Sequence, residues 1–213
     1  MIQRTESITF HDDAVDPGQV ISAEDRARAE LYNLLAVLLS RPPSGETLDA
    51  LKTLQGDSET EIGKGVSALA SLSGKLRTKA VEKEFNALFI GLGRGELLPY
   101  ASYYMTGFLN EKPLARLRRD MRGLGIGRAE TVREPEDNIA TLCEIMAGLI
   151  TGAFGAAAPL DQQNEFFRIH IGPWAGHFFS DLEAAQSSVF YAPVGTIGRA
   201  LIEVESEAFR IDK

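Results

Sequence analysis

The sequence predicts an all-α fold of about eight to ten helices. From about residue 22 onward, apolar residues recur every three to four positions, which is the spacing of one helix face. No convincing β-strand with alternating apolar and polar residues is predicted. The two candidate segments are residues 131–133, which are too few, and residues 6–10, which are isolated. No internal repeat is present, and a chain of 213 residues has room for one or two domains.

The N-terminal part of the chain divides into a loose arm and two helices with clear start signals. Residues 1–20 are polar and contain an Asp-Pro-Gly turn sequence, so we expect a flexible arm. Ser22, with Asp25 three residues later, starts a helix that the following Arg-Pro-Pro sequence stops. Ser44 then caps a second, short helix.

Two further helices are expected before the first glycine cluster. A weak apolar pattern marks residues 64–71, and a stronger one with Phe85 and Phe89 on one face marks residues 76–90. The glycines of residues 91–95 end that helix. A nucleotide-binding glycine loop must instead follow a strand and open a helix, so we reject a phosphate-binding interpretation of this cluster.

The main aromatic concentration of the chain lies in residues 100–109, which are predicted to be a loop. Large flat side chains there suit either caps of the core or the lining of a peptide groove, and their spacing does not separate the two. These residues are Tyr100, Tyr103, Tyr104, Met105 and Phe108. Pro113 then starts a basic helix, residues 114–124, whose arginines are expected to form a solvated face.

Residues 134–138 (Glu-Pro-Glu-Asp-Asn) open the longest apolar stretch of the chain, which runs to about residue 158. We expect Glu134 at the N-cap and Pro135 at the first helical position. Glu136 and Asp137 then fall in the first turn, where the helix dipole favours negative charge. One interpretation is an ordinary start of a buried helix. The other is an acidic spot at the mouth of a groove that binds a cation.

Three more helices complete the prediction. One begins near Leu160 and ends at the Gly172-Pro173 pair, because proline interrupts helical hydrogen bonding. The next carries Phe178 and Leu182 on its apolar face. The last runs from about residue 194 to residue 209.

The composition restricts the classes of function. A net charge of −8 and a pI of about 5.0 argue against a general nucleic-acid binder, which needs a basic face, and suit a basic peptide as partner. The single cysteine, Cys143, excludes an intrachain disulfide and a zinc site built from cysteines. No apolar run reaches the length of a membrane span and no secretory signal is visible, so we expect a cytoplasmic protein.

No catalytic site and no metal site are predicted. His170 and His177 lie on opposite sides of the Gly-Pro break, and neither an HExxH motif nor paired ExxH motifs occur. Cys143 lies in an apolar helical pattern, and no GxSxG motif exists. Nothing near Glu136 or Asp137 in the sequence completes a catalytic set. We therefore expect neither an enzyme nor a bound cofactor.

Several short stretches, taken in order, carry a resemblance to a known family. They are Glu84-Phe85-Asn86-Ala87-Leu88-Phe89-Ile90-Gly91, Leu98-Pro99-Tyr100-Ala101-Ser102-Tyr103-Tyr104, Glu134-Pro135-Glu136-Asp137-Asn138-Ile139, Phe166 to Trp174, and Phe190-Tyr191. Together they resemble the TorD/DmsD family, which consists of cytoplasmic chaperones for molybdenum-containing redox enzymes. Each motif alone is weak, but their order and spacing over roughly residues 25–205 are specific.

The resemblance implies one compact all-α domain over residues 21–213, as a monomer or a domain-swapped dimer. It implies a chaperone that binds the twin-arginine signal peptide of a molybdopterin-dependent oxidoreductase, assists cofactor insertion and holds back export until the partner has folded. The peptide-binding positions that carry over by motif are Phe85, Leu88, Phe89, Tyr100, Asp137 and Asn138. Relatives usually have His at Asn138, commonly have Pro at Leu92, and often have a larger or polar residue at Ala101. Because Asn does not titrate, no pH-dependent role is expected at residue 138.

Physical chemistry adds three positions to this set and leaves alternatives open. The carboxylates of Glu134 and Glu136 suit the guanidinium groups of a twin-arginine peptide, and Tyr104 suits its apolar helical part. One alternative is an assembly chaperone for a leaderless molybdoenzyme subunit, as the NarJ-type relatives are. Another is a small-molecule or nucleotide-binding protein, since weak guanine-nucleotide binding has been proposed in this family.

Overall fold

The computed structural model describes residues 21–91, 93–128 and 133–211, and these residues form ten α-helices and two π-helical turns. In chain order they are α1 (Ala23–Ser40), α2 (Gly45–Leu51), α3 (Glu61–Lys75), α4 (Thr78–Phe85), η1 (Asn86–Ile90), α5 (Ala101–Thr106), α6 (Lys112–Gly123), α7 (Ile139–Thr151), α8 (Leu160–Phe166), η2 (Phe167–Ile171), α9 (Ala175–Ala184) and α10 (Ala192–Ile211). Within these ranges the only β-type pairing is one isolated bridge, so the prediction of an all-α fold is confirmed. The expected N-terminal arm and Leu92 lie outside the described residues.

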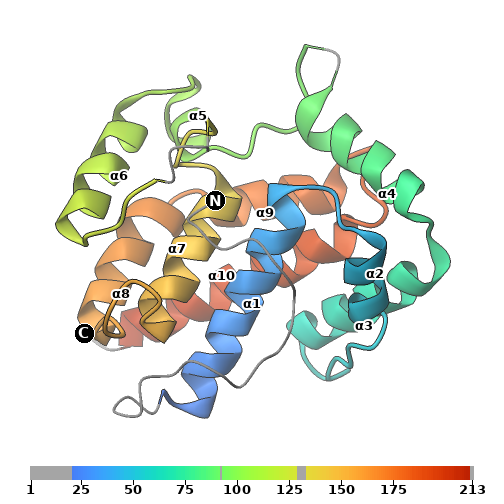
Figure 1. Ribbon diagram of the computed structural model, residues 1–213, viewed down its shortest axis with the longest axis horizontal. Helices are drawn as coiled ribbons and strands as arrows, with labels where there is room; N and C mark the ends of the chain where they lie inside the picture. The colour runs from blue at the N-terminus through green and yellow to red at the C-terminus, as the bar shows by residue number, and fades with distance from the viewer. Residues whose placement is uncertain (1–20, 92, 129–132, 212–213) are drawn as a thin grey trace.

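Long helices that pack in pairs form the core. α1 packs along α7, and α10 packs against both α9 and α3. Figure 1 shows α1 and α7 side by side across the middle of the molecule, with α10 behind them. α7 is buried along nearly its whole length, which agrees with its apolar sequence.

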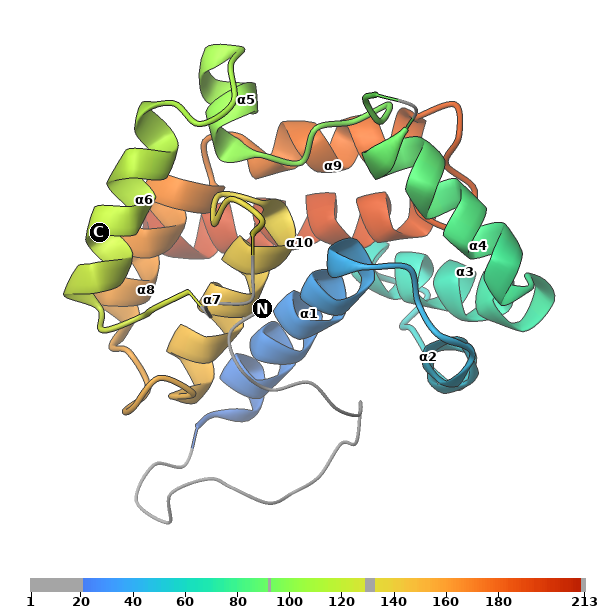
Figure 2. The same ribbon diagram turned by 45° about the horizontal axis from the view of Figure 1, so that its top comes forward.

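The remaining helices gather at two ends of this core. α2, α3 and α4 lie at one end, and α5, α6 and α8 lie at the other (Figures 1 and 2). Residues 91–100 connect η1, at the first end, to α5, at the second. Figure 2 shows residues 93–100 of this linker passing over α9.

A buried ion pair fixes α1 to α10. The guanidinium of Arg28 donates to both carboxylate oxygens of Glu205, at 2.7 and 2.9 Å, and the Tyr32 hydroxyl donates to the same carboxylate at 3.1 Å. Burial acts to lower the pKa of Arg28, but the hydrogen bond and charge of Glu205 outweigh it and the pKa is raised. Burial, aided by the Glu205 charge, also raises the pKa of Tyr32. Arg28 is therefore charged and Tyr32 neutral at physiological pH.

Several predicted helix boundaries are correct and others are wrong. Ser22 and Ser44 are N-caps as predicted, each accepting a backbone N–H three residues later. The third helix is longer than predicted, because Thr60 caps it at Glu61 and it continues to Lys75. The stretch from residue 101 to residue 109 is not wholly a loop, since α5 occupies its first six residues. The predicted helix over residues 76–90 changes to a π-helical turn after residue 85.

The predicted start of the central helix is also wrong. α7 begins at Ile139, and its N-cap is Asn138, whose side-chain oxygen accepts the N–H of Ala140 at 2.9 Å. The chain before it does not continue the helix because its backbone bonds to the linker ahead of α5. The N–H of Ile139 donates to the carbonyl of Pro99 at 2.9 Å, and the N–H of Ala101 donates to that of Asp137 at 3.0 Å. The helix ends at residue 151, before the end of the apolar stretch.

Candidate functional site

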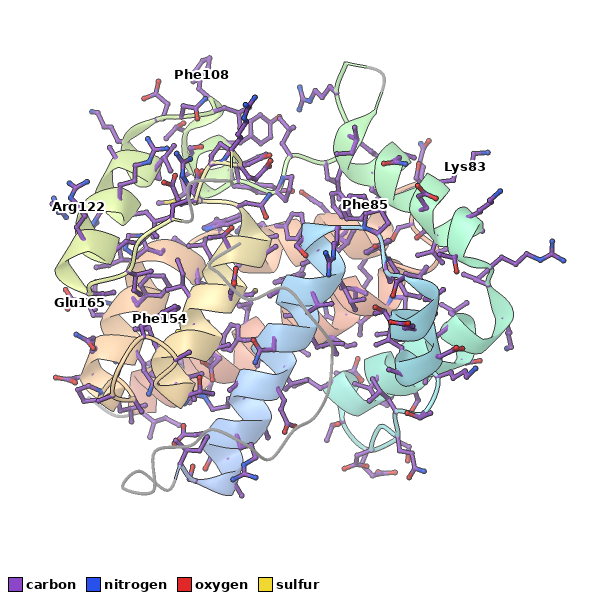
Figure 3. The ribbon with its side chains drawn as sticks, viewed as in Figure 1. Lys83, Phe85, Phe108, Arg122, Phe154 and Glu165 are labelled. Atoms are coloured by element: carbon purple, nitrogen blue, oxygen red, sulfur yellow. The ribbon has the colours of Figure 1, made fainter. Side chains whose placement is uncertain are left out.

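An aromatic cluster at the end of α4 contains the first three predicted peptide-binding residues. Phe85 and Phe89 lie edge to face with ring centroids 4.9 Å apart, and Phe89 lies 5.6 Å from Tyr191. Phe85 and Leu88 are buried, whereas Phe89 is partly exposed. Figure 3 places Phe85 on the inner side of α4. The cluster is therefore mainly core, and only Phe89 presents part of its ring to solvent.

The loop between α9 and α10 is held against this cluster by two carboxylates. Glu84 accepts the backbone N–H groups of Val189 and Tyr191, both at 2.8 Å. Glu96, on the linker, accepts those of Gln186 and Ser187 at 2.6 and 3.1 Å. Hydrogen bonds between charged acceptors and backbone donors are among the stronger ones in proteins. They fix the linker, the aromatic cluster and this loop as one surface.

Asp137 lies inside the molecule at the junction between the linker and α7. Its side chain is only 1% exposed, and its Oδ2 accepts the N–H of Ser102 at 2.8 Å. This bond satisfies a donor in the first turn of α5, which would otherwise be unpaired. Asp137 Oδ1 and Ser102 Oγ, both buried, have no hydrogen-bond partner among the described residues. Asp137 therefore stabilises the start of α5 and does not face solvent.

Glu136 is buried and already binds two arginines of the chain itself. Its Oε2 accepts from Arg118 on α6 at 2.8 Å, and its Oε1 lies 3.6 Å from Nε of Arg128. Burial acts to raise the pKa of Glu136, but the hydrogen bond from Arg118 and the two positive charges outweigh it and hold the pKa below its ordinary value. The expectation that all α6 arginines are merely solvated is therefore wrong for Arg118.

Two other carboxylates near α5 are exposed, and each is bonded to a tyrosine hydroxyl. Tyr100 donates to Glu134, and Tyr104 donates to Asp181 on α9 at 2.8 Å. Burial, together with the bonded carboxylate, raises the pKa of both tyrosines, so both hydroxyls keep their protons. The N–H of Tyr104 donates to the carbonyl of Tyr100, which places the tyrosines one helical turn, about 6 Å, apart. We call Glu134, Asp181, Tyr100 and Tyr104 the exposed acidic edge.

Sequence reasoning identified three members of the exposed acidic edge and missed Asp181. Asp181 lies on the partly polar surface of α9, and nothing in the local pattern distinguishes it from a solvated aspartate. Its role follows from Tyr104, which packs between Asp181 and the rings of Trp174 and Phe178. The contact joins segments 77 residues apart, so only the folded chain shows it.

The described residues contain neither a cluster of metal ligands nor a membrane-spanning helix. Within the three described ranges, no group of three His, Cys, Asp or Glu side chains could hold a metal ion. Over the same ranges, no helix is both long enough and apolar enough to cross a membrane. Cys143 is fully buried in α7, and burial raises the pKa of its thiol, so it packs as a small apolar side chain.

Comparisons with known proteins agree with the arrangement of these motifs. The family model described as nitrate reductase delta subunit matches residues 55–180. The chain is 22% identical to chaperone protein TorD of Vibrio parahaemolyticus over 209 residues, which cover 88% of this chain and 97% of the relative. It is 28% identical to TorD of Aliivibrio fischeri over 144 residues, which cover 61% and 67%. A solved structure of a redox enzyme maturation protein from Archaeoglobus fulgidus matches with a TM-score of 0.55 at 18% identity, covering 91% of this chain and 99% of that one.

These matches confirm the resemblance that the motifs carried. The structural match supports the fold, and the curated relatives are named as chaperones. The family model covers more than half of the 213 residues, including the linker, α5 and the start of α7. The chain therefore belongs to the nitrate reductase delta subunit family, which includes the TorD-type redox-enzyme maturation chaperones.

Proposed function

We propose that this protein is a cytoplasmic chaperone for a molybdenum-containing oxidoreductase. It binds the twin-arginine signal peptide of that enzyme and assists folding and cofactor insertion before export. The observation that carries the proposal is the exposed acidic edge, where Glu134 is bonded to Tyr100, the N-cap of α5, and Asp181 is bonded to Tyr104, four residues later. Two adjacent guanidinium groups need two acceptors a short distance apart, and arginine pairs well with carboxylates that are already oriented.

The apolar part of a signal peptide needs a separate surface, and one lies at the other end of the linker. Ile90 is 59% exposed and Val189 is 56% exposed, beside the partly exposed ring of Phe89. The bond from the Val189 N–H to Glu84 fixes this loop beside the end of α4. A twin-arginine leader has its arginines first and its apolar segment after them. The two surfaces, joined by residues 91–100, suit that order with the arginines at α5 and the apolar segment toward η1.

The proposal is tested by calorimetric titration with a panel of twin-arginine leader peptides, each beside a twin-lysine control. The variants are Glu134→Gln and Asp181→Asn, singly and together, because both side chains are exposed and their loss leaves the core intact. Each lost contact between charged groups is worth roughly 1.5 kcal/mol, so we expect about tenfold weaker binding per variant. Glu24→Gln, an exposed carboxylate at the start of α1, is the matched control and should have no effect.

The predicted roles of Glu136, Asp137 and Asn138 in peptide binding stay predictions. Because Asp137 supports the start of α5, an Asp137→Ala variant would confuse lost folding with lost binding. The edge variants avoid this problem. Unchanged leader affinity in the double variant would refute the exposed acidic edge as the arginine site.

A second candidate function is assembly of a leaderless molybdoenzyme subunit. The observation that favours it is the description of the matching family model, which names a nitrate reductase subunit. In this case no leader peptide of the panel would bind, and a mature subunit lacking its leader would bind equally well to the protein and to the double edge variant. The two candidates therefore give opposite results in the same titration.

A further inference from the structure

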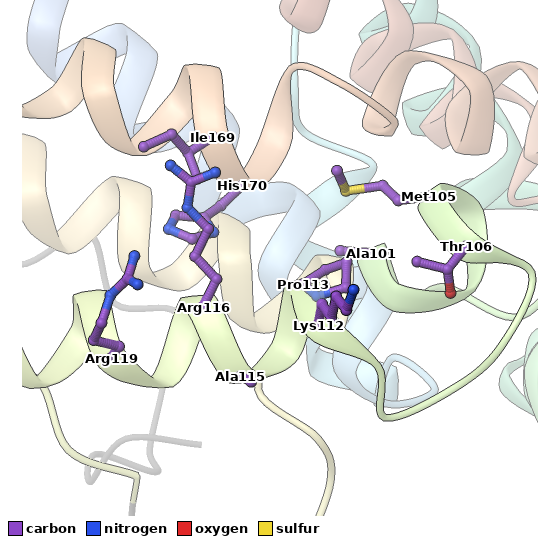
Figure 4. Close-up of a pocket in the computed structure, with 10 residues that line it drawn as sticks. All are labelled: Ala101, Met105, Thr106, Lys112, Pro113, Ala115, Arg116, Arg119, Ile169 and His170. Carbon is purple, nitrogen blue, oxygen red and sulfur yellow. The ribbon is translucent and has the colours of Figure 1, made fainter.

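A groove between α5 and α6 has a different chemistry from the exposed acidic edge. It lies between α5, α6 and η2 and has a volume of about 760 Å³. Figure 4 shows Met105 entering from α5, Arg116 and Arg119 rising from α6, and Ile169 and His170 closing the far wall. Lys112 lies at the end of the groove nearest α5. None of these contacts belongs to the proposed leader site.

One wall of the groove is a row of cations. Lys112, Arg116 and Arg119 lie four and three residues apart on α6, which corresponds to about 6 and 4.5 Å along the helix axis. The carboxylate of Asp120 contacts this row and lies 3.7 Å from Arg116 and 3.0 Å from Arg119. The groove wall therefore has a net positive charge on a chain whose overall charge is −8.

His170 adds no charge to this balance at physiological pH. Burial lowers its pKa, and this effect, aided by the charges of Arg116 and Arg119, outweighs the opposing charge and hydrogen bond of Asp120. Its Nε2 lies 3.1 Å from Asp120 Oδ2. In the neutral ring the hydrogen on Nε2 is therefore donated to this carboxylate. Asp120 is thereby held between the arginines and the histidine, and it neutralises only part of the positive wall.

Met105, which lines the groove, and two side chains of the adjoining loop are apolar and exposed to solvent. Met105 is 45% exposed, and Phe108 and Leu109, in the loop that joins α5 to α6, are also exposed. Figure 3 shows Phe108 at the outer tip of this loop. Large apolar side chains that gather beside a charged row on the surface commonly mark a protein interaction site. Met and Phe are also favoured where a binding surface accepts an apolar helix face.

We propose that this groove is a second binding site, for an acidic amphipathic helix of a partner protein. Carboxylates on successive turns of that helix face Lys112, Arg116 and Arg119, and its apolar side chains cover Met105 and the adjoining loop. The spacing favours a helix over a small anion, because a row of cations spread over about 10 Å does not converge on one phosphate group. The twin-arginine segment is excluded from this groove by like charge.

The partner's identity as a client enzyme rests on the proposed function, but binding at the groove does not. The probe is a synthetic 18-residue helical peptide with glutamates at positions i, i+4 and i+7 beside a leucine face. Two control peptides have the same composition with the glutamates on the opposite face, or lysine in place of each glutamate. Affinity is measured by fluorescence anisotropy at low and at raised salt, since contacts between exposed charges weaken with ionic strength.

We expect the first peptide to bind and both controls to bind at least tenfold more weakly. The double variant Arg116→Gln with Arg119→Gln should weaken binding about tenfold or more, by loss of two charged contacts. Met105→Ser should weaken binding several-fold without changing its salt dependence. Arg77→Gln with Lys79→Gln, two exposed cations at the start of α4, is the matched control and should leave the affinity unchanged.

Equal binding of the face-swapped peptide, or equal loss in the α4 control, would overturn the proposal in favour of unspecific charge attraction. Inorganic phosphate that binds and is lost in the Arg116 and Arg119 variant, with no peptide binding, would overturn it in favour of a small-anion site. Failure of every leader peptide together with normal binding of the acidic helix would refute only the proposed function. Normal leader binding without binding of the acidic helix would refute only the groove.

Discussion

Four carboxylates near the start of α5 fall into two pairs with opposite surroundings. Glu136 and Asp137 point inward. Glu136 binds two arginines, and Asp137 accepts a backbone N–H. Glu134 and Asp181 point outward, and each is bonded to the hydroxyl of a tyrosine. The inward pair lies within three residues of Glu134 in the sequence. Adjacency in sequence therefore does not give these carboxylates a common role.

The difference indicates that one pair of carboxylates positions the site and the other pair is available to contact a ligand. The inward pair ties α5, α6 and the start of α7 together, so it determines where Tyr100 and Tyr104 lie. Each carboxylate of the outward pair is held by a hydrogen bond from one of those tyrosines and is exposed to solvent. A binding site functions best when the side chains that contact the ligand are positioned by others that do not. The comparison predicts that inward variants change stability and outward variants change binding.

The largest effect is expected for Asp137→Ala. It leaves the buried N–H of Ser102 without its acceptor and opens a small cavity, which together cost about 2–3 kcal/mol of the free energy of unfolding. Asp137→Asn keeps an oxygen for that N–H and should cost less than about 1 kcal/mol. Urea unfolding of both variants measures the difference. Equal and small losses for both would show that Asp137 does not support α5.

The helices themselves were predictable from the sequence because their signals are local. Serine caps, proline stops and apolar spacing are local signals, and they predicted both ends of α1 and the start of α2 correctly. The start of α7 was not predictable in this way. The segment before it satisfies its backbone with Pro99 and Ala101, which are nearly 40 residues away in the chain.

The candidate site was partly predictable for the same reason. The motifs located the junction between the linker and α7, but they did not show which carboxylates face inward. Glu136 is buried because Arg118 and Arg128 reach it from elements that no local pattern connects to it. Asp181 joins the site only through Tyr104, a contact between distant segments. Packing between helices, rather than the sequence around each residue, decides these positions.

A medium effect is expected for the bond between Arg118 and Glu136, and it should depend on pH. Because the pKa of Glu136 is lowered below the ordinary value of 4.5, its ionised form stabilises the folded state above about pH 5. This stability is lost as the pH falls through the folded pKa, since protonation removes the charge that Arg118 and Arg128 bind. Arg118→Ala should cost about 1 kcal/mol at pH 7, a reduced value because Arg118 is half exposed.

The measurement is the unfolding free energy of the wild type, Arg118→Ala and Glu136→Gln between pH 7 and pH 3. The gap between the wild type and Glu136→Gln should close as the pH falls. Glu61→Gln is the control, because Glu61 pairs with Lys64 on a fully solvated surface and should show little change. A gap that stays constant over this range would mean that the charge of Glu136 does not contribute to stability.

The smallest effects are expected for Tyr100→Phe and Tyr104→Phe, which test the outward pair most directly. Both substitutions keep the ring, and with it the packing of Tyr104 on Trp174 and Phe178, so stability should change by less than about 1 kcal/mol. Without the hydroxyl, Glu134 or Asp181 is no longer held in place and must be ordered when the peptide binds, which should weaken leader affinity about threefold. Titration with a twin-arginine leader and its twin-lysine control separates the cases. An equal loss of affinity for both peptides would show that the tyrosines affect only general charge attraction. Oriented carboxylates require a loss of affinity that is confined to the twin-arginine leader.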